Sequence, residues 1–143
     1  MSMQGREVQG SQLRYGLQHG PWSVYASATR QRSRNTSQDN KAFIGIPRHS
    51  GALRTAYDWQ ALPLTTWWQL AWVGERYANA DNTLKVSGYQ RHDIGLQLEH
   101  GTTRYHLRVR NLFDKQYIAA LSSPNALYPG QGRQLWARVV VAF

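Results

Sequence analysis

The sequence of 143 residues contains no cysteine, which excludes disulfide bonds, zinc–thiolate sites and thiol nucleophiles. Charged residues are also scarce, since only 17% of the chain is Asp, Glu, Lys or Arg. Acidic residues are the rarer of the two: the chain has eight Asp and Glu residues and 17 Lys and Arg residues, for a formal net charge of +9. The lack of cysteine is compatible with an oxidising compartment, and the excess of basic residues raises the question of an anionic partner.

Long hydrophobic runs are missing as well. A membrane-spanning helix needs about 20 mostly apolar residues, whereas the apolar stretch at 61–74 is shorter and contains Pro63. Residues 1–20 have no apolar segment of the kind found in secretory signals. If this chain enters a membrane, we expect it to do so as β-strands. We also expect it to be a fragment of a longer exported chain whose signal peptide is absent.

The basic residues are mostly arginine, with Lys at only three of the 17 positions. They are spread along the chain, often at every second residue, whereas a nucleic-acid site is more often a cluster that includes lysine. We therefore expect no nucleic-acid partner, and a soluble basic β-protein that binds nucleic acid stays as an alternative. Trp and Tyr make up 14 of the 17 aromatic residues, and these amphipathic rings suit a membrane interface or a binding surface.

Alternation with a period of two residues is the strongest pattern in the sequence. In residues 103–111, Tyr105, Leu107 and Val109 alternate with Arg104, His106, Arg108 and Arg110. This pattern predicts a strand with one apolar and one polar face. Similar alternation predicts six further strands near residues 13–18, 22–29, 52–59, 64–72, 92–100 and 134–143. We expect seven strands of about 10 to 14 residues, closer to membrane-spanning strands than to globular ones.

The connections between these segments alternate between short and long. Residues 19–21, 61–63 and 100–102 form short connections, and residues 35–47, 78–88 and 113–131 form long ones. The pattern predicts an all-β, antiparallel up-and-down meander with tight turns at one end and long loops at the other, as in bacterial outer-membrane barrels. We expect aromatic girdles near both ends, with Trp22, Trp59, Trp67 and Trp68 near the short turns and Tyr77, Tyr89 and Phe113 near the long loops.

Two C-terminal motifs carry a family resemblance. The segments "VRNLFDKQY" (109–117) and "GQGRQLWARVVVAF" (130–143) resemble the C-terminal signature of TonB-dependent outer-membrane receptors of the siderophore-receptor type. The segments 46–59 and 87–100, and the Gly5-x-Glu7 element, resemble upstream strands of the same family. The signature residues are Asn111, Leu112, Phe113, Asp114, Tyr117, Gly132 and Arg133.

The resemblance implies that residues 1–143 are the last seven strands of a 22-stranded barrel in the Gram-negative outer membrane, without the plug domain. The full receptor would take up ferric siderophores or a similar large, scarce ligand, with energy supplied through TonB. It would need no cofactor. Phe143 at the end of the last strand would be the signal that the barrel-assembly machinery recognises, and outer-membrane lipid would surround the apolar face.

The polar face of the predicted strands is the candidate site. It would face the barrel lumen, where arginines hold a polar plug by charge-assisted hydrogen bonds or attract anionic chelates. We expect neither a metal site nor an enzyme, because the five histidines are scattered and no nucleophile elbow or carboxylate pair stands out. A small self-contained or oligomeric outer-membrane pore remains a second alternative. The predicted lumen-facing residues are Arg54, Arg91, Asp93, Arg104, His106, Arg108, Arg110 and Arg138.

Overall fold

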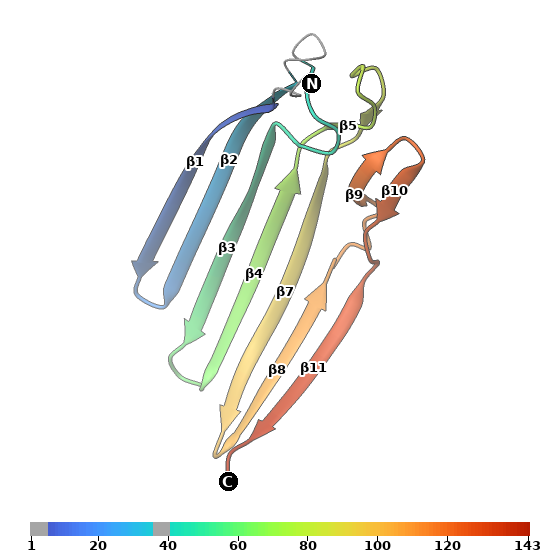
Figure 1. Ribbon diagram of the computed structural model, residues 1–143. Coiled ribbons are helices and arrows are strands. Elements are labelled where there is room, and N and C mark those ends of the chain that lie inside the picture. The colour runs from blue at the N-terminus through green and yellow to red at the C-terminus, as the bar shows by residue number, and fades with distance from the viewer. Residues whose placement is uncertain (1–5, 36–40) are drawn as a thin grey trace.

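The computed structural model describes residues 6–35 and 41–143, so Gly5 of the Gly-x-Glu element and part of the 35–47 connection lie outside the described residues. Seven strands form one antiparallel sheet in the order β1-β2-β3-β4-β7-β8-β11 (Figure 1). This confirms the predicted all-β meander. The strands are β1 (Arg6–His19), β2 (Trp22–Asn35), β3 (His49–Trp59), β4 (Leu64–Val73), β7 (Tyr89–His100), β8 (Thr103–Arg110) and β11 (Gln134–Val141).

The remaining four strands are short and lie inside the long connections. They form two small hairpins, β5 (Arg76–Tyr77) with β6 (Lys85–Val86), and β9 (Ile118–Ser123) with β10 (Ala126–Pro129). The sequence did not predict them, because two to six residues are too few to establish an alternating pattern. Within the described residues, no helix is long and apolar enough to cross a membrane.

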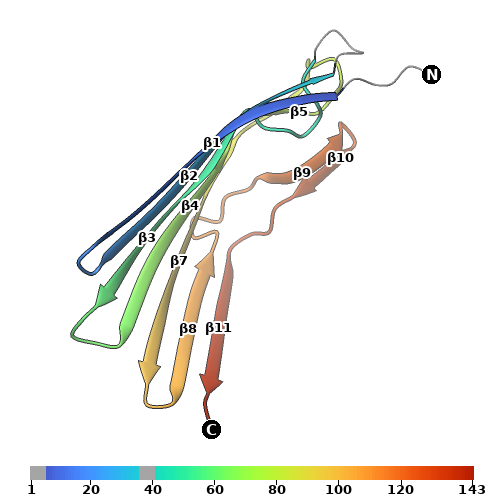
Figure 2. The ribbon, with the colours of Figure 1, turned by 60° about the vertical axis from the view of Figure 1, so that its left-hand side comes forward.

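Short turns and long loops lie at opposite ends of the sheet, as the connection lengths predicted (Figure 1). Gly20 and Gly101 adopt φ angles of 57° and 61° in two of the short turns, a backbone conformation that favours glycine. The third short turn closes with a hydrogen bond from the Leu62 N–H to the Trp59 carbonyl at 2.9 Å. Figure 2 shows that the sheet is curved and open, with β1 and β11 at its two edges.

The strand register separates polar from apolar side chains. Cross-strand partners share a face, and one row of partners runs through Arg54, Gln69 and Asp93. The neighbouring row, on the other face, runs through Thr55, Trp68 and Ile94. We call these the polar face and the apolar face. In the part of the chain that the structure describes, the apolar face is open, whereas the last connection packs on the loop end of the polar face through Tyr117 and Tyr89.

The described part of the chain has almost no hydrophobic core. Ala78 is the one apolar residue there that is buried, while Leu13 and Leu135 on the apolar face are 72% and 70% exposed. Leaving so much apolar surface in water is unfavourable by roughly 25 cal/mol for each Å². The apolar face therefore needs a nonaqueous surrounding, such as lipid, for the fold to be stable.

Two strands are shorter than predicted. Strands β8 and β11 each have eight residues. Strand β8 stops at Arg110 because Asn111 adopts a φ of 54°, which an extended strand does not allow. Strand β11 stops at Val141, opposite Thr103, because β8 offers no partner beyond that residue.

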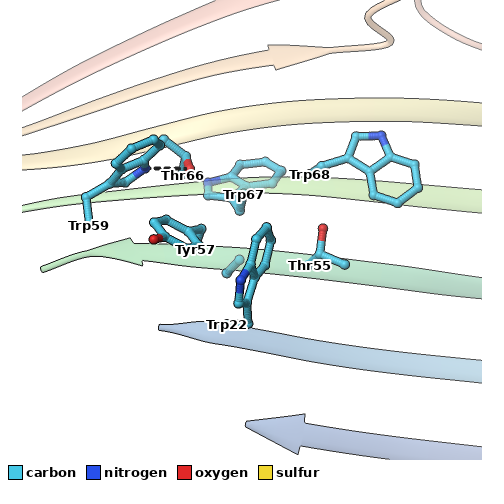
Figure 3. A pocket seen from close by; sticks show the side chains of 8 residues that line it. Trp22, Thr55, Tyr57, Trp59, Thr66, Trp67 and Trp68 are labelled. Atoms are coloured by element: carbon cyan, nitrogen blue, oxygen red, sulfur yellow. Dashed lines mark hydrogen bonds between the residues drawn. The ribbon is translucent and has the colours of Figure 1, made fainter. Parts of the chain in front are cut away.

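An aromatic cluster marks the short-turn end of the apolar face (Figure 3). Trp22 and Trp59 lie on either side of Tyr57, with ring centroids 4.7 and 4.9 Å from it, and the Trp59 Nε1–H donates to the Thr66 hydroxyl at 3.0 Å. Trp67, which its nearness to a turn predicts to be part of the same girdle, lies on the polar face, since its cross-strand partners are Ala56 and Gly95. Nearness to a turn fixes the height of a residue on the sheet but not the face it occupies.

Candidate functional site

Asp93 is the centre of the polar face. Its side chain is only 1% exposed, and its carboxylate lies 3.4 Å from Arg91 Nε and 3.4 Å from Arg108 Nη2. Its Oδ1 atom also accepts the backbone N–H of Asn111 at 2.9 Å. One carboxylate thus holds two arginines from β7 and β8 and fixes the end of β8.

A tryptophan lies beside this cluster. Trp67 extends over Gly95, where an added Cβ would come within 2.3 Å of the indole ring. The guanidinium carbons of Arg54 and Arg108 lie 4.8 and 5.7 Å from the Trp67 ring centroid, within the range of cation–π attraction. Trp67 is not among the predicted lumen-facing residues, although its alternation with Trp68 predicts the face that it occupies.

The other four predicted lumen residues lie on the same face but not in the Asp93 cluster. Arg104 pairs with Glu99 at 3.3 Å, and these side chains are 61% and 50% exposed. His106 is the cross-strand partner of both Gln97 and Arg138, and Arg110 is opposite Gln134. The polar face is therefore continuous across β3, β4, β7, β8 and β11. Among the residues that the structure describes, no three His, Asp or Glu side chains are grouped to hold a metal ion.

Asn111 connects three segments of the chain through its buried side chain, which is 1% exposed. Its amide nitrogen donates to the carbonyls of Lys115 and Gln131 at 3.0 and 3.1 Å, and its amide oxygen accepts the Lys115 N–H at 2.9 Å. Asparagine tolerates the positive φ of this position better than most residues do. The residue therefore fixes the end of β8 to both ends of the long connection that follows.

The other signature residues extend the same arrangement. Asp114, at a φ of 52°, accepts the Arg133 N–H at 2.9 Å, and the Leu112 N–H donates to the His92 carbonyl at 2.7 Å. An added Cβ on Gly132 would lie 3.0 Å from the Asp114 carboxylate oxygen, which explains a small residue there. Phe113 is 69% exposed and meets the His92 ring edge-on at 4.9 Å.

Tyr117 completes this set of signature contacts. Its ring stacks on Tyr89 of β7 at 4.3 Å, and its carbonyl accepts the Gly130 N–H at 2.8 Å. A side chain on Gly130 would collide with the Tyr117 ring, since a Cβ there would come within 2.1 Å. The structure thus brings Asn111, Leu112, Asp114, Tyr117, Gly132 and Arg133 together at the start of β11, where β7, β8 and the last connection meet.

The three long connections also contact one another. The Asn82 side chain accepts the Ala42 N–H at 2.7 Å and donates to the Ala42 carbonyl at 3.0 Å. The Gly45 N–H donates to the Tyr77 carbonyl at 3.0 Å. These bonds join the connection before β3 to the one after β4, so the loop end is an ordered layer in the described part of the chain.

Arg76 holds the last connection against this layer. It is 3% exposed, and its guanidinium donates to the carbonyls of Ile118 and Ala119, the latter at 3.2 Å. It also lies over the Tyr89 ring at 5.6 Å. Burial lowers the pKa of Arg76 below its ordinary value, but an arginine remains charged. Arg76 could not be predicted from the sequence, because its partners are backbone carbonyls, which every residue has whatever its side chain.

Phe143 lies beyond the end of β11 and is fully exposed. It does not continue the strand, contrary to the alternation that placed it beside Val141. The backbone still follows the sheet edge for one more residue, because the Ala142 N–H donates to the Thr102 carbonyl at 2.9 Å. The C-terminus therefore lies at the short-turn end (Figure 1).

Comparison with solved structures identifies the fold. The siderophore receptor PiuA from Acinetobacter baumannii is 21% identical with a TM-score of 0.83, and the match covers 94% of this chain and 21% of PiuA. The ferric yersiniabactin uptake receptor FyuA from Yersinia pestis is 20% identical with a TM-score of 0.81, over 96% of this chain and 24% of FyuA. The copper transporter OprC is 23% identical with a TM-score of 0.78, over 96% of this chain and 24% of OprC.

The chain thus spans about a quarter or less of the length of these structures. A search of the curated proteins by sequence found no match. The profile of one family, described as TonB dependent receptor-like, beta-barrel, matches residues 2–112, most of the chain. That family consists of transport receptors of the Gram-negative outer membrane and is not an enzyme class. On this match and on the fold, the chain belongs to the TonB-dependent receptor-like β-barrel family.

Proposed function

We propose that this chain is part of the barrel wall of an outer-membrane transporter that takes up ferric siderophores or a similar large, scarce ligand, with energy supplied through TonB. The seven strands would be the last of 22. Further strands would pair with the open edges of β1 and β11, because long apolar edge strands left unpaired are prone to aggregate. In this arrangement the apolar face meets lipid and the polar face lines the lumen.

The observation that carries the proposal is the two-faced sheet with an arginine-rich polar side. A soluble β-sandwich would bury the apolar face against a second sheet, whereas Leu13 and Leu135 on this face are 72% and 70% exposed. On the polar face, Asp93 fixes Arg91 and Arg108, while Arg54 and Arg108 share the Trp67 ring. Such a wall offers charge-assisted donors to a plug or to an anionic ferric chelate on its way through the barrel.

The test is ferric siderophore uptake by cells whose only receptor is the complete protein that contains these strands. We expect uptake that requires TonB and falls about tenfold or more with Arg108→Leu, while Arg108→Lys, which keeps the positive charge, retains more of it. Uptake that is independent of TonB would contradict the proposal. TonB-dependent uptake of copper, without uptake of a siderophore, would support the proposed transport mechanism but refute the proposed ligand.

We also propose that Phe143 is read by the barrel-assembly machinery. Its full exposure beyond β11 leaves the ring free for a partner. Deletion of Phe143 from the complete receptor should lower the amount of folded barrel in outer membranes, as measured by heat-modifiable electrophoresis. An unchanged amount of folded barrel would refute this role.

A further inference from the structure

Near the loop end of β2, the side chains on the apolar face change from apolar to basic. Side chains of a strand alternate between faces, so Trp22, Val24, Ala26 and Ala28 share the apolar face with Arg30 and Arg32. Both arginines are exposed. Two cations thus continue a row of apolar side chains on the face that, under the proposed function, meets lipid.

The height of these arginines matches the edge of a bilayer. At about 3.4 Å per residue and a strand tilt of about 40°, Arg30 lies about 21 Å and Arg32 about 26 Å above Trp22 along the membrane normal. The apolar band of an outer-membrane barrel is about 25 Å tall. With Trp22 in the aromatic cluster at one border, Arg30 and Arg32 fall at the opposite border, at the level of lipid headgroups.

A groove leads down from these arginines along the apolar face. It has a volume of about 400 Å³, and Leu13, Ala28 and Trp72 line its apolar part, with Arg30 and His49 beside them. Trp72 extends over Gly51, where an added Cβ would come within 2.0 Å of the indole ring. A second hollow of about 530 Å³ shares Ser11 and Arg30 with the groove and is also lined by Arg32 and Arg48.

The arginines at the head of the groove have no acidic partner in the described part of the chain. There, no side-chain hydrogen bond or ion pair involves Arg30, Arg32 or Arg48. Arg34, the next arginine on the same face, differs because it pairs with Glu7 at 2.9 Å. Guanidinium groups bind phosphate with two parallel hydrogen bonds, so unpaired arginines beside an apolar groove suit an amphiphile with a phosphate headgroup.

We propose that this groove binds a phosphate-bearing lipid of the outer leaflet, an inference that rests on the proposed membrane position of the chain. The phosphate lies on Arg30 and Arg32, with Arg48 nearby, and an acyl chain lies between Leu13, Ala28 and Trp72. The apolar part of the groove selects a lipid over free phosphate, since a free anion would leave it empty. The bound lipid would hold β1, β2 and β3 at a fixed depth in the membrane.

The test measures lipid binding to the complete receptor, extracted from outer membranes in mild detergent. Native mass spectrometry would titrate purified lipid A with two phosphates, with phosphatidylethanolamine and inorganic phosphate as comparison probes. We expect lipid A to bind best and the double variant Arg30→Gln/Arg32→Gln to bind it at least about tenfold more weakly. Ala28→Phe, which fills the groove and keeps the face apolar, should also weaken binding.

The matched control is Arg14→Gln/Arg104→Gln, which should bind lipid A as the unmodified receptor does. It removes two charges from the polar face, where Arg14 of β1 lies in the same row of cross-strand partners as Arg91. Heat-modifiable electrophoresis establishes that each variant is folded. Binding by the Arg30/Arg32 variant within twofold of the unmodified receptor would overturn the proposal, as would equal binding of inorganic phosphate and lipid A. Siderophore uptake, measured in parallel, shows separately whether the proposed transport function holds.

Discussion

At the scale of single residues, two buried polar side chains organise the sheet. Asp93 and Asn111 are each 1% exposed and are joined by the bond from the Asn111 N–H to the Asp93 carboxylate. Asp93 draws the arginines of the polar face together, and Asn111 connects β8 to the connection that follows it. The segment 87–100, which contains Asp93, and the segment 109–117, which contains Asn111, therefore form one structural unit.

Replacing Asp93 should be the most damaging single change on the polar face. Asp93→Asn keeps an acceptor for the Asn111 N–H but leaves Arg91 and Arg108 without a carboxylate. Since removing one partner of a buried ion pair is strongly destabilising, we expect the free energy of unfolding to fall by about 3 kcal/mol. Urea unfolding of the folded receptor in detergent, followed by tryptophan fluorescence, measures this value.

Glu99→Gln is the control for that measurement, since it also removes a carboxylate from β7. Its partner Arg104 is 61% exposed, and exposed pairs are worth less than about 1 kcal/mol. Equal losses of stability in the two variants would show that Asp93 does not have the central role described here.

At the scale of elements, side chains that bond to backbone atoms hold the loop end: Asn82 and Arg76 join the long connections, and Asn111 and Asp114 hold the start of β11. The small hairpin β9–β10 is joined to the sheet through Arg76, Tyr89 and Tyr117. Arg76 reaches carbonyls more than forty positions further along the chain. Its loss would leave those carbonyls without their donor while the strands below stay paired.

Arg76→Gln should therefore release the β9–β10 hairpin without unfolding the sheet. We expect the segment 113–131 to be cleaved several-fold faster by protease added to intact cells, because local opening exposes the backbone. Lys85→Gln is the control, since the Lys85–Glu75 pair is long, at 3.8 Å, and its side chains are 59% and 68% exposed. Equal cleavage in both variants would argue against the role assigned to Arg76.

At the scale of the whole molecule, the fold was largely predictable from the sequence and the site only in part. The alternation of residues such as Arg104 and Arg108 predicts both where a strand lies and which face is polar, and the connection lengths predict the order of the strands. Tertiary contacts to backbone atoms could not be predicted, which is why Arg76 and Asn82 were missed. Trp67 was predicted to belong to an aromatic girdle because it is near a turn, whereas its alternation with Trp68 predicts the polar face that it occupies.

The central claim is that this sheet spans a membrane with its apolar face toward lipid and its polar face toward water. The 143 residues contain no cysteine, so no native cysteine among them would react with the label. Single cysteines can therefore be introduced along β8 from 104 to 109. Each would carry a nitroxide label in the complete receptor in lipid vesicles. Electron paramagnetic resonance would then measure collisions with oxygen, which concentrates in lipid, and with a water-soluble nickel chelate.

The account predicts two opposite periodicities along the strand. Labels at 105, 107 and 109 should collide mainly with oxygen, and labels at 104, 106 and 108 should collide less with oxygen and more with the nickel chelate. Uniform access of the nickel chelate to every position, or the reverse phase of alternation, would contradict the account.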